Sequence, residues 1–420
     1  MASENPDRPA AATGGARIDF DEPIDRRGTE CLKYDAYAAR GHAADDLPMW
    51  VADMDERIPA PAIEALQRRV AHGVFGYSDP DESYYEAVLA WVERHQGWRP
   101  ERSWLVKTPG VVFALAQAVR AFTEPGDAVL IQRPVYYPFT NVIRDNGRTV
   151  VCAPLAYDPG AGDERFRGGR YAVDLQAFER VVEQTSPRLF ILCNPHNPVG
   201  RAWTPEELRG MGEVCLRHGV TVVSDEIHAD FARPGFAHTS FASLGDEFAR
   251  ACVVCTSASK TFNIAGLQIS NIFVPDPALR ARFERACAQT GYDEVNALGF
   301  VATRACYEHG DDWLAQLKEH LERNLALFAD TLAREAPELR LVRPESTYLL
   351  WVDCSALGLD DEGLRAFVER DARLWLDTGT MFGPEGAGFI RVNIACPRQT
   401  VEETCRRLVA ATRAWRERQG

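Results

Sequence analysis

The segment LFILCNPHNPVG, residues 189–200, decides the fold class, because an apolar run of strand length ends abruptly in a polar loop. Two further segments repeat this pattern, VTVVSDEIH at residues 220–228 and ACVVCTSASK at residues 251–260. Each run is almost continuously apolar, as expected of a strand that is buried on both faces of a parallel sheet. Similar runs lie at residues 128–132, 150–154 and 269–274.

Segments with helical periodicity separate these runs, and the alternation predicts an α/β fold. Helices are expected at residues 60–72, 81–95, 111–122, 136–146, 174–185, 204–218, 277–289, 311–336, 360–371 and 400–417. After residue 295 the rhythm changes to long helices and two later strands, at residues 348–353 and 389–394. We therefore expect a disordered tail at residues 1–17 and a large domain at residues 59–295. Residues 18–58 and 296–420 together are expected to form a smaller domain.

The composition excludes several classes of function. The chain has 420 residues and a formal net charge of −14, from 47 basic and 61 acidic side chains, which argues against nucleic acid or an anionic membrane as the partner. The sequence contains no run of about 18 apolar residues, so no membrane span is predicted. The odd number of cysteines, 11, suits reduced thiols, and no Cys/His set resembles a metal site. Because the N-terminus also lacks the apolar run of a signal peptide, we expect a cytoplasmic enzyme.

Polar clusters follow the apolar runs, at the sheet edge where ligands bind in open α/β folds. Lys260 ends one run and is one of only four lysines, and a desolvated lysine can form a Schiff base. Asp225 ends another run and can keep a ring nitrogen protonated, while Asn197 can donate to a phenolic oxygen. Ser257 and the helix start at Gly110 can hold a phosphate. Together these groups predict pyridoxal 5′-phosphate as the cofactor.

Other residues near these clusters also admit a plain structural interpretation. Tyr136 and Tyr137 are either core aromatics or stack on a cofactor ring. We interpret His196 and His228 as structural. Arg391 lies on an alternating strand and needs a carboxylate partner. Arginine, however, supplies all but four of the 47 basic residues, so Arg391 alone does not identify a substrate site.

Four longer stretches carry a family resemblance: FDEPIDRRGT at 20–29, PMWVADMD at 48–55, SASKTFN at 257–263 and FIRVNIACPR at 389–398. With them the chain resembles the MalY/PatB-like cystathionine β-lyase (carbon–sulfur lyase) family, pyridoxal-phosphate enzymes of the aspartate aminotransferase fold. The resemblance extends from about residue 20 to the last helix. It implies fold type I, in which a large domain has a mainly parallel seven-stranded sheet between helices and a smaller domain is α+β.

The resemblance also implies how the cofactor is held. Lys260 would be the Schiff-base lysine, Asp225 the partner of the ring nitrogen and Asn197 a contact of the ring hydroxyl. Tyr136 would stack on the ring and, with Lys260, act in catalysis. The phosphate would be held by Val111, Val112 and Ser257.

On the substrate side, the resemblance implies that Arg391 holds the substrate carboxylate, with Trp50 and Asp53 nearby. Tyr77 would reach the cofactor phosphate of a neighbouring subunit, which implies a homodimer with shared active sites. The family usually has phenylalanine where this chain has Glu56, and a charged side chain there can alter the substrate pocket. Ala387 replaces a more usual acidic residue.

The implied reaction is β-elimination of cystathionine or another S-substituted L-cysteine to a thiol, pyruvate and ammonia. The cofactor motifs alone leave an aminotransferase open, because both reactions begin with removal of the Cα proton. Specialised chemistry on a cysteine thiol conjugate in a biosynthetic pathway is a further alternative. A non-catalytic regulatory protein is disfavoured by the intact set of site residues. The sequence does not determine the native thioether or any assembly beyond a dimer.

Overall fold

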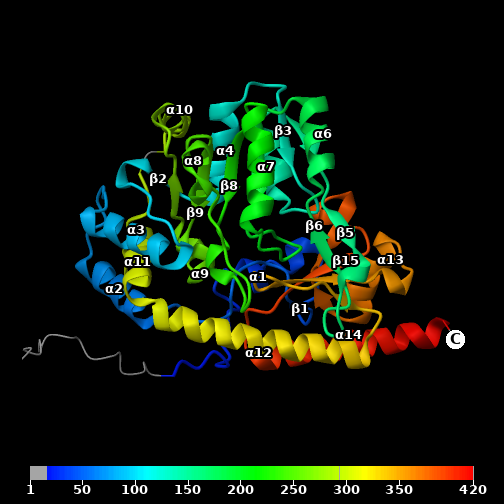
Figure 1. Cartoon of the computed structure of the whole chain (residues 1–420). Helices are drawn as coiled ribbons and strands as arrows, with labels where there is room; N and C mark the ends of the chain where they lie inside the picture. Colours follow the sequence, from blue (N-terminus) through cyan, green and yellow to red (C-terminus); the bar gives the residue numbers. More distant parts are fainter. Residues whose placement is uncertain (1–16, 293, 420) are drawn as a thin grey trace, which may run out of the picture.

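A seven-stranded sheet forms the centre of the computed structural model, which describes residues 17–292 and 294–419 (Figure 1). The expected tail at residues 1–17 therefore lies outside the described residues except for Arg17. In spatial order the strands are β2 (Leu105–Thr108), β10 (Ser270–Phe273), β9 (Cys252–Thr256), β8 (Thr221–Asp225), β7 (Leu189–Cys193), β3 (Ala128–Ile131) and β4 (Thr149–Cys152). The five strands from β9 to β4 are parallel, and β10 is antiparallel to both β9 and β2. The mainly parallel sheet is confirmed.

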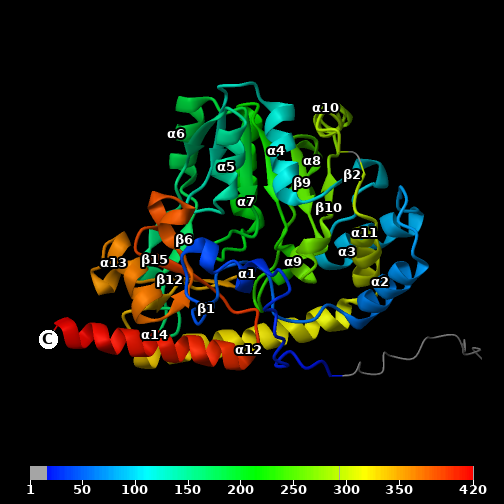
Figure 2. The ribbon, with the colours of Figure 1, turned by 180° about the vertical axis from the view of Figure 1, so that it is seen from behind.

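Helices cover both faces of this sheet (Figures 1 and 2). One face carries α4 (Val111–Phe122), α5 (Pro138–Asp145) and α10 (Pro277–Ala288), and the other carries α6 (Leu175–Thr185), α7 (Pro205–Arg217) and α8 (Asp246–Arg250). Along β7, Leu189 and Ile191 belong to one hydrophobic core, whereas Phe190 and Leu192 belong to the other. Burial on both faces explains why the sequence of this strand is continuously apolar.

At one end of the sheet, α2 (Ala60–His72), α3 (Glu82–Gln96) and α11 (Ala297–His309) pack together (Figure 1). The sequence pattern did not predict α11. This helix contacts both α2 and α3 and buries side chains around most of its circumference, so it lacks one apolar stripe.

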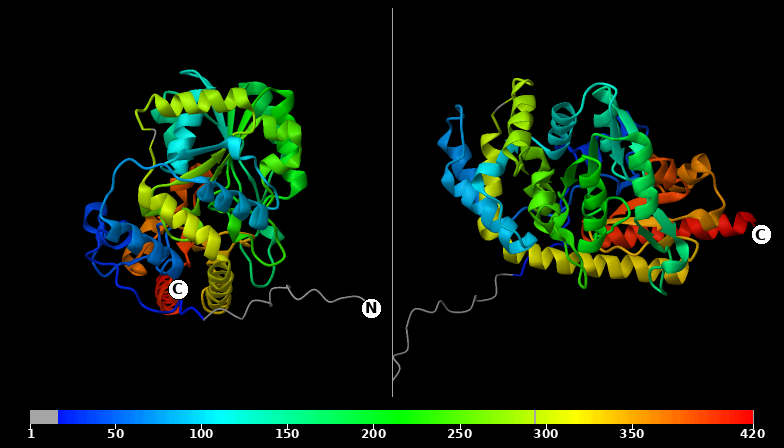
Figure 3. Two further views of the ribbon diagram at one scale, coloured as in Figure 1. Left: turned by 90° about the vertical axis from the view of Figure 1, so that its left-hand side faces the viewer. Right: turned by 45° about the horizontal axis from the view of Figure 1, so that its top comes forward.

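The smaller part of the molecule contains a four-stranded antiparallel sheet. Its strands are, in order, β11 (Arg340–Leu341), β12 (Leu349–Asp353), β15 (Phe389–Asn393) and β14 (Asp377–Thr378). Two long helices, α12 (Asp311–Glu335) and α14 (Arg398–Gln419), lie side by side (Figure 3). The shorter elements are α1 (Leu32–Asp35), α9 (Ala258–Thr261), α13 (Asp361–Ala366), β5 (Ala156–Asp158) and β6 (Arg170–Ala172).

The N-terminal segment packs against the smaller part. Strand β1 (Leu47–Pro48) pairs in parallel with β13 (Leu374–Trp375), and the Asp55 N–H donates to the Ala395 carbonyl at 3.1 Å. The proposed domain boundaries, at residues 59–295 and at 18–58 with 296–420, remain a prediction. Within the described residues, no helix is both long and apolar enough to cross a membrane.

Candidate active site

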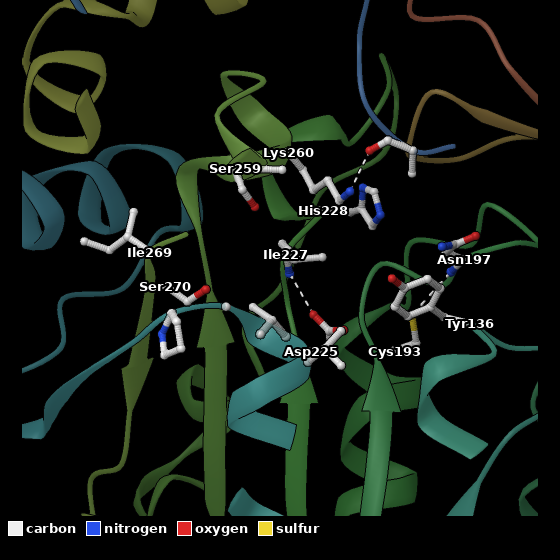
Figure 4. Close-up of a pocket in the computed structure, with 16 residues that line it drawn as sticks. Tyr136, Cys193, Asn197, Asp225, Ile227, His228, Ser259, Lys260, Ile269 and Ser270 are labelled. Atoms are coloured by element: carbon white, nitrogen blue, oxygen red, sulfur yellow. Dashed lines mark hydrogen bonds between the residues drawn. The ribbon is translucent and has the colours of Figure 1, made fainter. Parts of the chain in front are cut away.

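A cavity of about 190 Å³ lies at the carboxyl ends of β7, β8 and β9, where the sequence places its polar clusters (Figure 4). Loops after these strands, the start of α4 and the N-terminal segment at Ala52 enclose it. The predicted site residues that line it are Val111, Val112, Tyr136, Asn197, Asp225 and Lys260.

Lys260 lies on the short helix α9, which begins directly after β9. The Ser257 hydroxyl caps this helix by accepting a hydrogen bond from the Ser259 N–H at 3.1 Å. The Lys260 Nζ donates to the Ala52 carbonyl at 2.5 Å, along a dashed line in Figure 4. The N-terminal segment thereby holds the amine in the cavity at the carboxyl ends of the strands.

The environment of Lys260 shifts its amine toward the neutral form. Burial lowers the pKa of Lys260 to about 8, the Arg391 charge acts in the same direction, and Asp53 and Asp225 oppose both. A neutral amine is the form that attacks a carbonyl carbon and accepts a proton.

Asp225 ends the central strand β8, paired in register with Cys193 of β7 and Cys255 of β9. Its carboxylate accepts a hydrogen bond from the Ile227 N–H at 3.2 Å. Burial raises the pKa of Asp225 to about 7, although the Ile227 N–H and the Lys260 charge lower it. No cation within residues 17–292 and 294–419 forms an ion pair with this carboxylate. A protonated ring nitrogen placed opposite Asp225 would keep it ionised.

The loop after β7 places Asn197 beside Tyr136 (Figure 4). The Tyr136 N–H donates to the Asn197 carbonyl at 3.0 Å, and the Asn197 N–H donates to Cys193 Sγ at 3.4 Å. The side-chain oxygen of Asn197 accepts a hydrogen bond from Arg391 Nη1 at 3.0 Å. Since this oxygen is engaged, the Asn197 amide group is oriented to donate, and the phenol of Tyr136 offers a flat surface next to it.

The start of α4 supplies an anion-binding end to the cavity. Gly110 precedes the helix, and the N–H groups of its first turn have no acceptor within the helix. Ser257, predicted as a phosphate ligand, does not line the cavity, because its hydroxyl donates to the Ile269 carbonyl at 2.8 Å and caps α9. Ser259 and Ser270 line the cavity instead.

Arg391 approaches the cavity from the smaller sheet. Strand register places it directly opposite Asp377, and the two side chains form a buried ion pair through Nη2. The same nitrogen donates to the Trp50 carbonyl at 2.8 Å. Arg391 thus links the large sheet, through Asn197, to the N-terminal segment.

Comparison with known proteins identifies the family. The profile described as "Aminotransferase class I and II" matches residues 51–408. Cystathionine beta-lyase PatB of Bacillus subtilis is 43% identical to the chain, covering 94% of the chain and 100% of PatB. Protein MalY of Escherichia coli is 33% identical, covering 95% of the chain and 100% of MalY. The chain belongs to the PatB/MalY-type cystathionine β-lyase family.

A solved structure agrees with this assignment. Cystalysin from Treponema denticola, whose crystal structure contains a pyridoxal 5′-phosphate cofactor, matches with a TM-score of 0.89 at 34% identity, over 94% of this chain and 99% of cystalysin. The family and the aminotransferase-type fold that the sequence indicated are confirmed.

Besides Ser257 and Arg391, three further predicted residues of this PatB/MalY-type chain do not line the main cavity. Trp50 is buried and stacks on Trp375 at a centroid distance of 4.6 Å. Asp53 lines an adjoining cavity of about 280 Å³ that shares Ala265 with the main one. Tyr77 is 96% exposed. Their predicted roles toward substrate and cofactor remain predictions.

A buried chain of charges holds the Asp53 segment in place. Asp55 accepts hydrogen bonds from Lys33 Nζ at 2.7 Å, from the Tyr34 hydroxyl at 2.9 Å and from Arg26 Nη1 at 2.8 Å. The other end of the Arg26 guanidinium pairs with Asp53 at 2.6 Å. Burial alone would raise the pKa of Asp55, but Lys33 and Arg26 lower it below its ordinary value. Asp55 is therefore an ionised anchor.

Glu56, the departure from the family pattern, is buried next to this anchor and does not reach the main cavity. Neither carboxyl oxygen has a hydrogen-bond partner of regular geometry among the described residues, and His320 Nε2 lies 3.7 Å from Oε1. Burial, with a smaller contribution from Asp55, raises the pKa of Glu56 to about 8. It is therefore mostly protonated at neutral pH.

Three contributors to the site were not predicted. His228, which we interpreted as structural, lines the cavity beside Lys260 (Figure 4), and burial lowers its pKa to about 3, so its imidazole is neutral. Its position in the DEIH cluster was the available signal. Ala52 acts through its backbone carbonyl, and Asp377 lies on a strand of two residues, so neither had a side-chain pattern to reveal it.

Proposed function

We propose that this protein is a pyridoxal-phosphate-dependent carbon–sulfur β-lyase that releases a thiol, pyruvate and ammonia from L-cystathionine or another S-substituted L-cysteine. The main support is the cavity that the Lys260 amine and the buried Asp225 acid both line, together with the Arg391 guanidinium, which donates to the lining residue Asn197. The family assignment supports the reaction class.

The residues of the cavity fit pyridoxal phosphate. Asp225 is a buried acid without a cationic partner among the described residues, which suits a ring nitrogen that must stay protonated. The Asn197 amide suits the ring hydroxyl, the Tyr136 phenol suits the ring face, and the first turn of α4 suits the phosphate. When bound, the cofactor draws electrons from the Cα–H bond of an attached amino acid and makes that proton acidic.

The side chains divide the remaining work. Arg391 binds the substrate carboxylate and so orients the substrate. Lys260 Nζ, whose lowered pKa of about 8 favours loss of its proton, accepts the Cα proton in its neutral form. The neutral imidazole of His228 narrows the cavity beside Lys260 and adds no competing charge. The Cβ–S bond then breaks with its electron pair going to sulfur, so the sulfur leaves as a thiolate, and water hydrolyses the remaining three-carbon fragment to pyruvate and ammonia.

One experiment tests the reaction class. The purified holoenzyme is mixed with L-cystathionine, and the cofactor absorbance, free thiol and pyruvate are recorded. The proposal predicts thiol and pyruvate in equal amounts with the cofactor absorbance retained. Conversion of the cofactor to its amine form without pyruvate would indicate an aminotransferase. A cofactor-loaded protein that leaves cystathionine unchanged but cleaves another thioether would indicate specialised chemistry on a different cysteine conjugate, and absence of bound cofactor would favour a regulatory protein.

We also propose a cytoplasmic homodimer in which Tyr77 reaches the phosphate end of the partner's site. Val74, Phe75 and Tyr77 are 62%, 55% and 96% exposed on one loop, a large apolar exposure that contact with a second copy would bury. Mixing Lys260→Ala and Tyr77→Ala subunits should restore activity, because one site of each mixed dimer then has both residues. Failure of the refolded mixture to regain activity would contradict shared sites.

A further inference from the structure

A buried carboxylate already occupies the guanidinium that is proposed to hold the substrate. Asp377 on β14 lies directly opposite Arg391 on β15, and both side chains are 3% exposed. Their ion pair joins Asp377 Oδ2 to Arg391 Nη2. Because antiparallel register sets the two residues side by side, this contact is a fixed feature of the sheet.

The hydrogen bonds of Arg391 leave limited room for a second carboxylate. Its Nη1 donates to Asn197, its Nη2 donates to both the Trp50 carbonyl and Asp377, and its Nε has no partner among the described residues. A carboxylate held by two parallel bonds uses either both Nη nitrogens or Nε with Nη2. Both arrangements include Nη2, so a substrate carboxylate held in this way shares that nitrogen with Asp377 and lies next to its carboxylate.

We propose that Asp377 shares Arg391 with the substrate carboxylate and takes up one proton from solvent when the substrate binds. The inference rests on the proposed function, because it takes Arg391 as the carboxylate partner. Two ionised carboxylates on one guanidinium would leave a net negative charge in a buried place, which a low dielectric disfavours. Asp377 is the group that gains the proton, since burial already raises its pKa above that of an ordinary carboxyl group. Asp377 is thus a positioning residue whose protonation sets substrate affinity.

The surroundings of Asp377 agree with this role. The charged and titratable groups that face it are Arg391 on β15, Arg40 of the short helix η1 (Ala38–Arg40), and the phenols of Tyr136 and Tyr137 before α5. Burial raises the pKa of Asp377 above its ordinary value, although Arg391 and Arg40 lower it. A carboxylate that two nearby cations do not fully stabilise gains a proton readily when a second anion arrives.

The test uses 3-(methylthio)propionate, which has the thioether and the carboxylate of a substrate but no amino group to react with the cofactor. Its dissociation constant for the holoenzyme is measured by calorimetry from pH 5.5 to 8.5, and in phosphate and Tris buffers to count protons. We expect binding to weaken by up to about tenfold per pH unit, with uptake of about one proton. Asp377→Asn should lose this slope, take up almost no proton, and bind about tenfold more tightly at pH 8.

A control variant and the contrary results complete the experiment. Asp353→Asn removes another buried aspartate of the same sheet, paired with Arg340, and should keep the wild-type slope. An unchanged slope in Asp377→Asn, wild-type binding without proton uptake, or no binding at all would overturn the proposal. If Asp377→Asn does not fold, the proton count of the wild-type protein tests the proposal: uptake of about one proton supports it, and binding without proton uptake overturns it. Since no turnover is involved, failure to cleave cystathionine would contradict the proposed function and leave this result intact.

Discussion

The cofactor side and the substrate side of the cavity are built in different ways. On the cofactor side, Asp225 ends a parallel strand, and Asn197 and Lys260 follow the two strands beside it, so the sheet brings the three together. On the substrate side, Arg391 depends on a two-residue strand and on a carbonyl of the N-terminal segment. A parallel sheet therefore supplies cofactor geometry directly, whereas the substrate geometry depends on one buried ion pair and on hydrogen bonds between segments far apart in sequence.

The largest expected effect tests the cofactor side. Lys260→Ala removes the amine that accepts the Cα proton, and kcat for thiol release should fall by about 10³-fold or more. Lys318→Ala removes a lysine of α12 that does not line the cavity and should stay within about threefold of wild type in the same thiol assay. Near-normal elimination by Lys260→Ala would place the base elsewhere.

The next prediction breaks the buried anchor of the substrate side. Lys33→Met leaves Asp55 without its buried cation and should lower the free energy of unfolding by about 3–5 kcal/mol, measured by denaturant unfolding of the cofactor-free protein. Lys107→Met is the matched control, because its partner Asp79 is 81% exposed, and it should cost about 0–1 kcal/mol. Equal costs for the two variants would show that the anchor does not hold the N-terminal segment.

A third prediction concerns Arg391 itself. Arg391→Lys keeps the positive charge but loses the paired N–H groups, so kcat/KM for L-cystathionine should fall by about 10²-fold, mainly through KM. Steady-state kinetics measures this effect, while the cofactor absorbance should be unchanged. Loss of bound cofactor in this variant would contradict the separation of the two sides.

The smallest effect concerns Glu56 and depends on pH. The pKa of Glu56 is raised to about 8 in the folded state, so the unfolded chain loses this proton first as pH rises from about 4.5 to 8. The stabilisation that the Glu56 carboxyl contributes is therefore fully present below about pH 4.5 and is lost as the pH rises from about 4.5 to 8. Glu56→Gln has no proton to lose here. Relative to the thermal midpoint of wild type, its own thermal midpoint should therefore rise by a few degrees when the pH is raised from 5 to 8.

The exposed Glu22 supplies the control for this titration. Its pKa is lowered by the hydrogen bond from Arg57 and by the Arg57 charge, so its shift has the opposite sign. The thermal midpoint of Glu22→Gln should therefore not rise relative to that of wild type as the pH rises. A constant difference between Glu56→Gln and wild type at every pH would mean that folding does not raise the pKa of Glu56.

The sequence predicted the cofactor side better than the substrate side for a physical reason. Asp225 ends one buried strand and Lys260 follows another, and the apolar run of each strand is visible in one segment. The partners of Arg391 lie on other segments, and one of them is a backbone carbonyl, so no local pattern could reveal them. Ser257 shows a finer limit, because a serine next to a strand end suits a phosphate ligand and a helix cap equally well.

The most direct measurement of the central claim is the product balance over many turnovers without any keto acid. Holoenzyme is incubated with a large excess of L-cystathionine, and homocysteine, pyruvate and ammonia are counted against the enzyme. The account predicts the three products in equal amounts, far exceeding the enzyme concentration. A single turnover that stops, and that resumes only when a keto acid is added, would contradict it and show an aminotransferase.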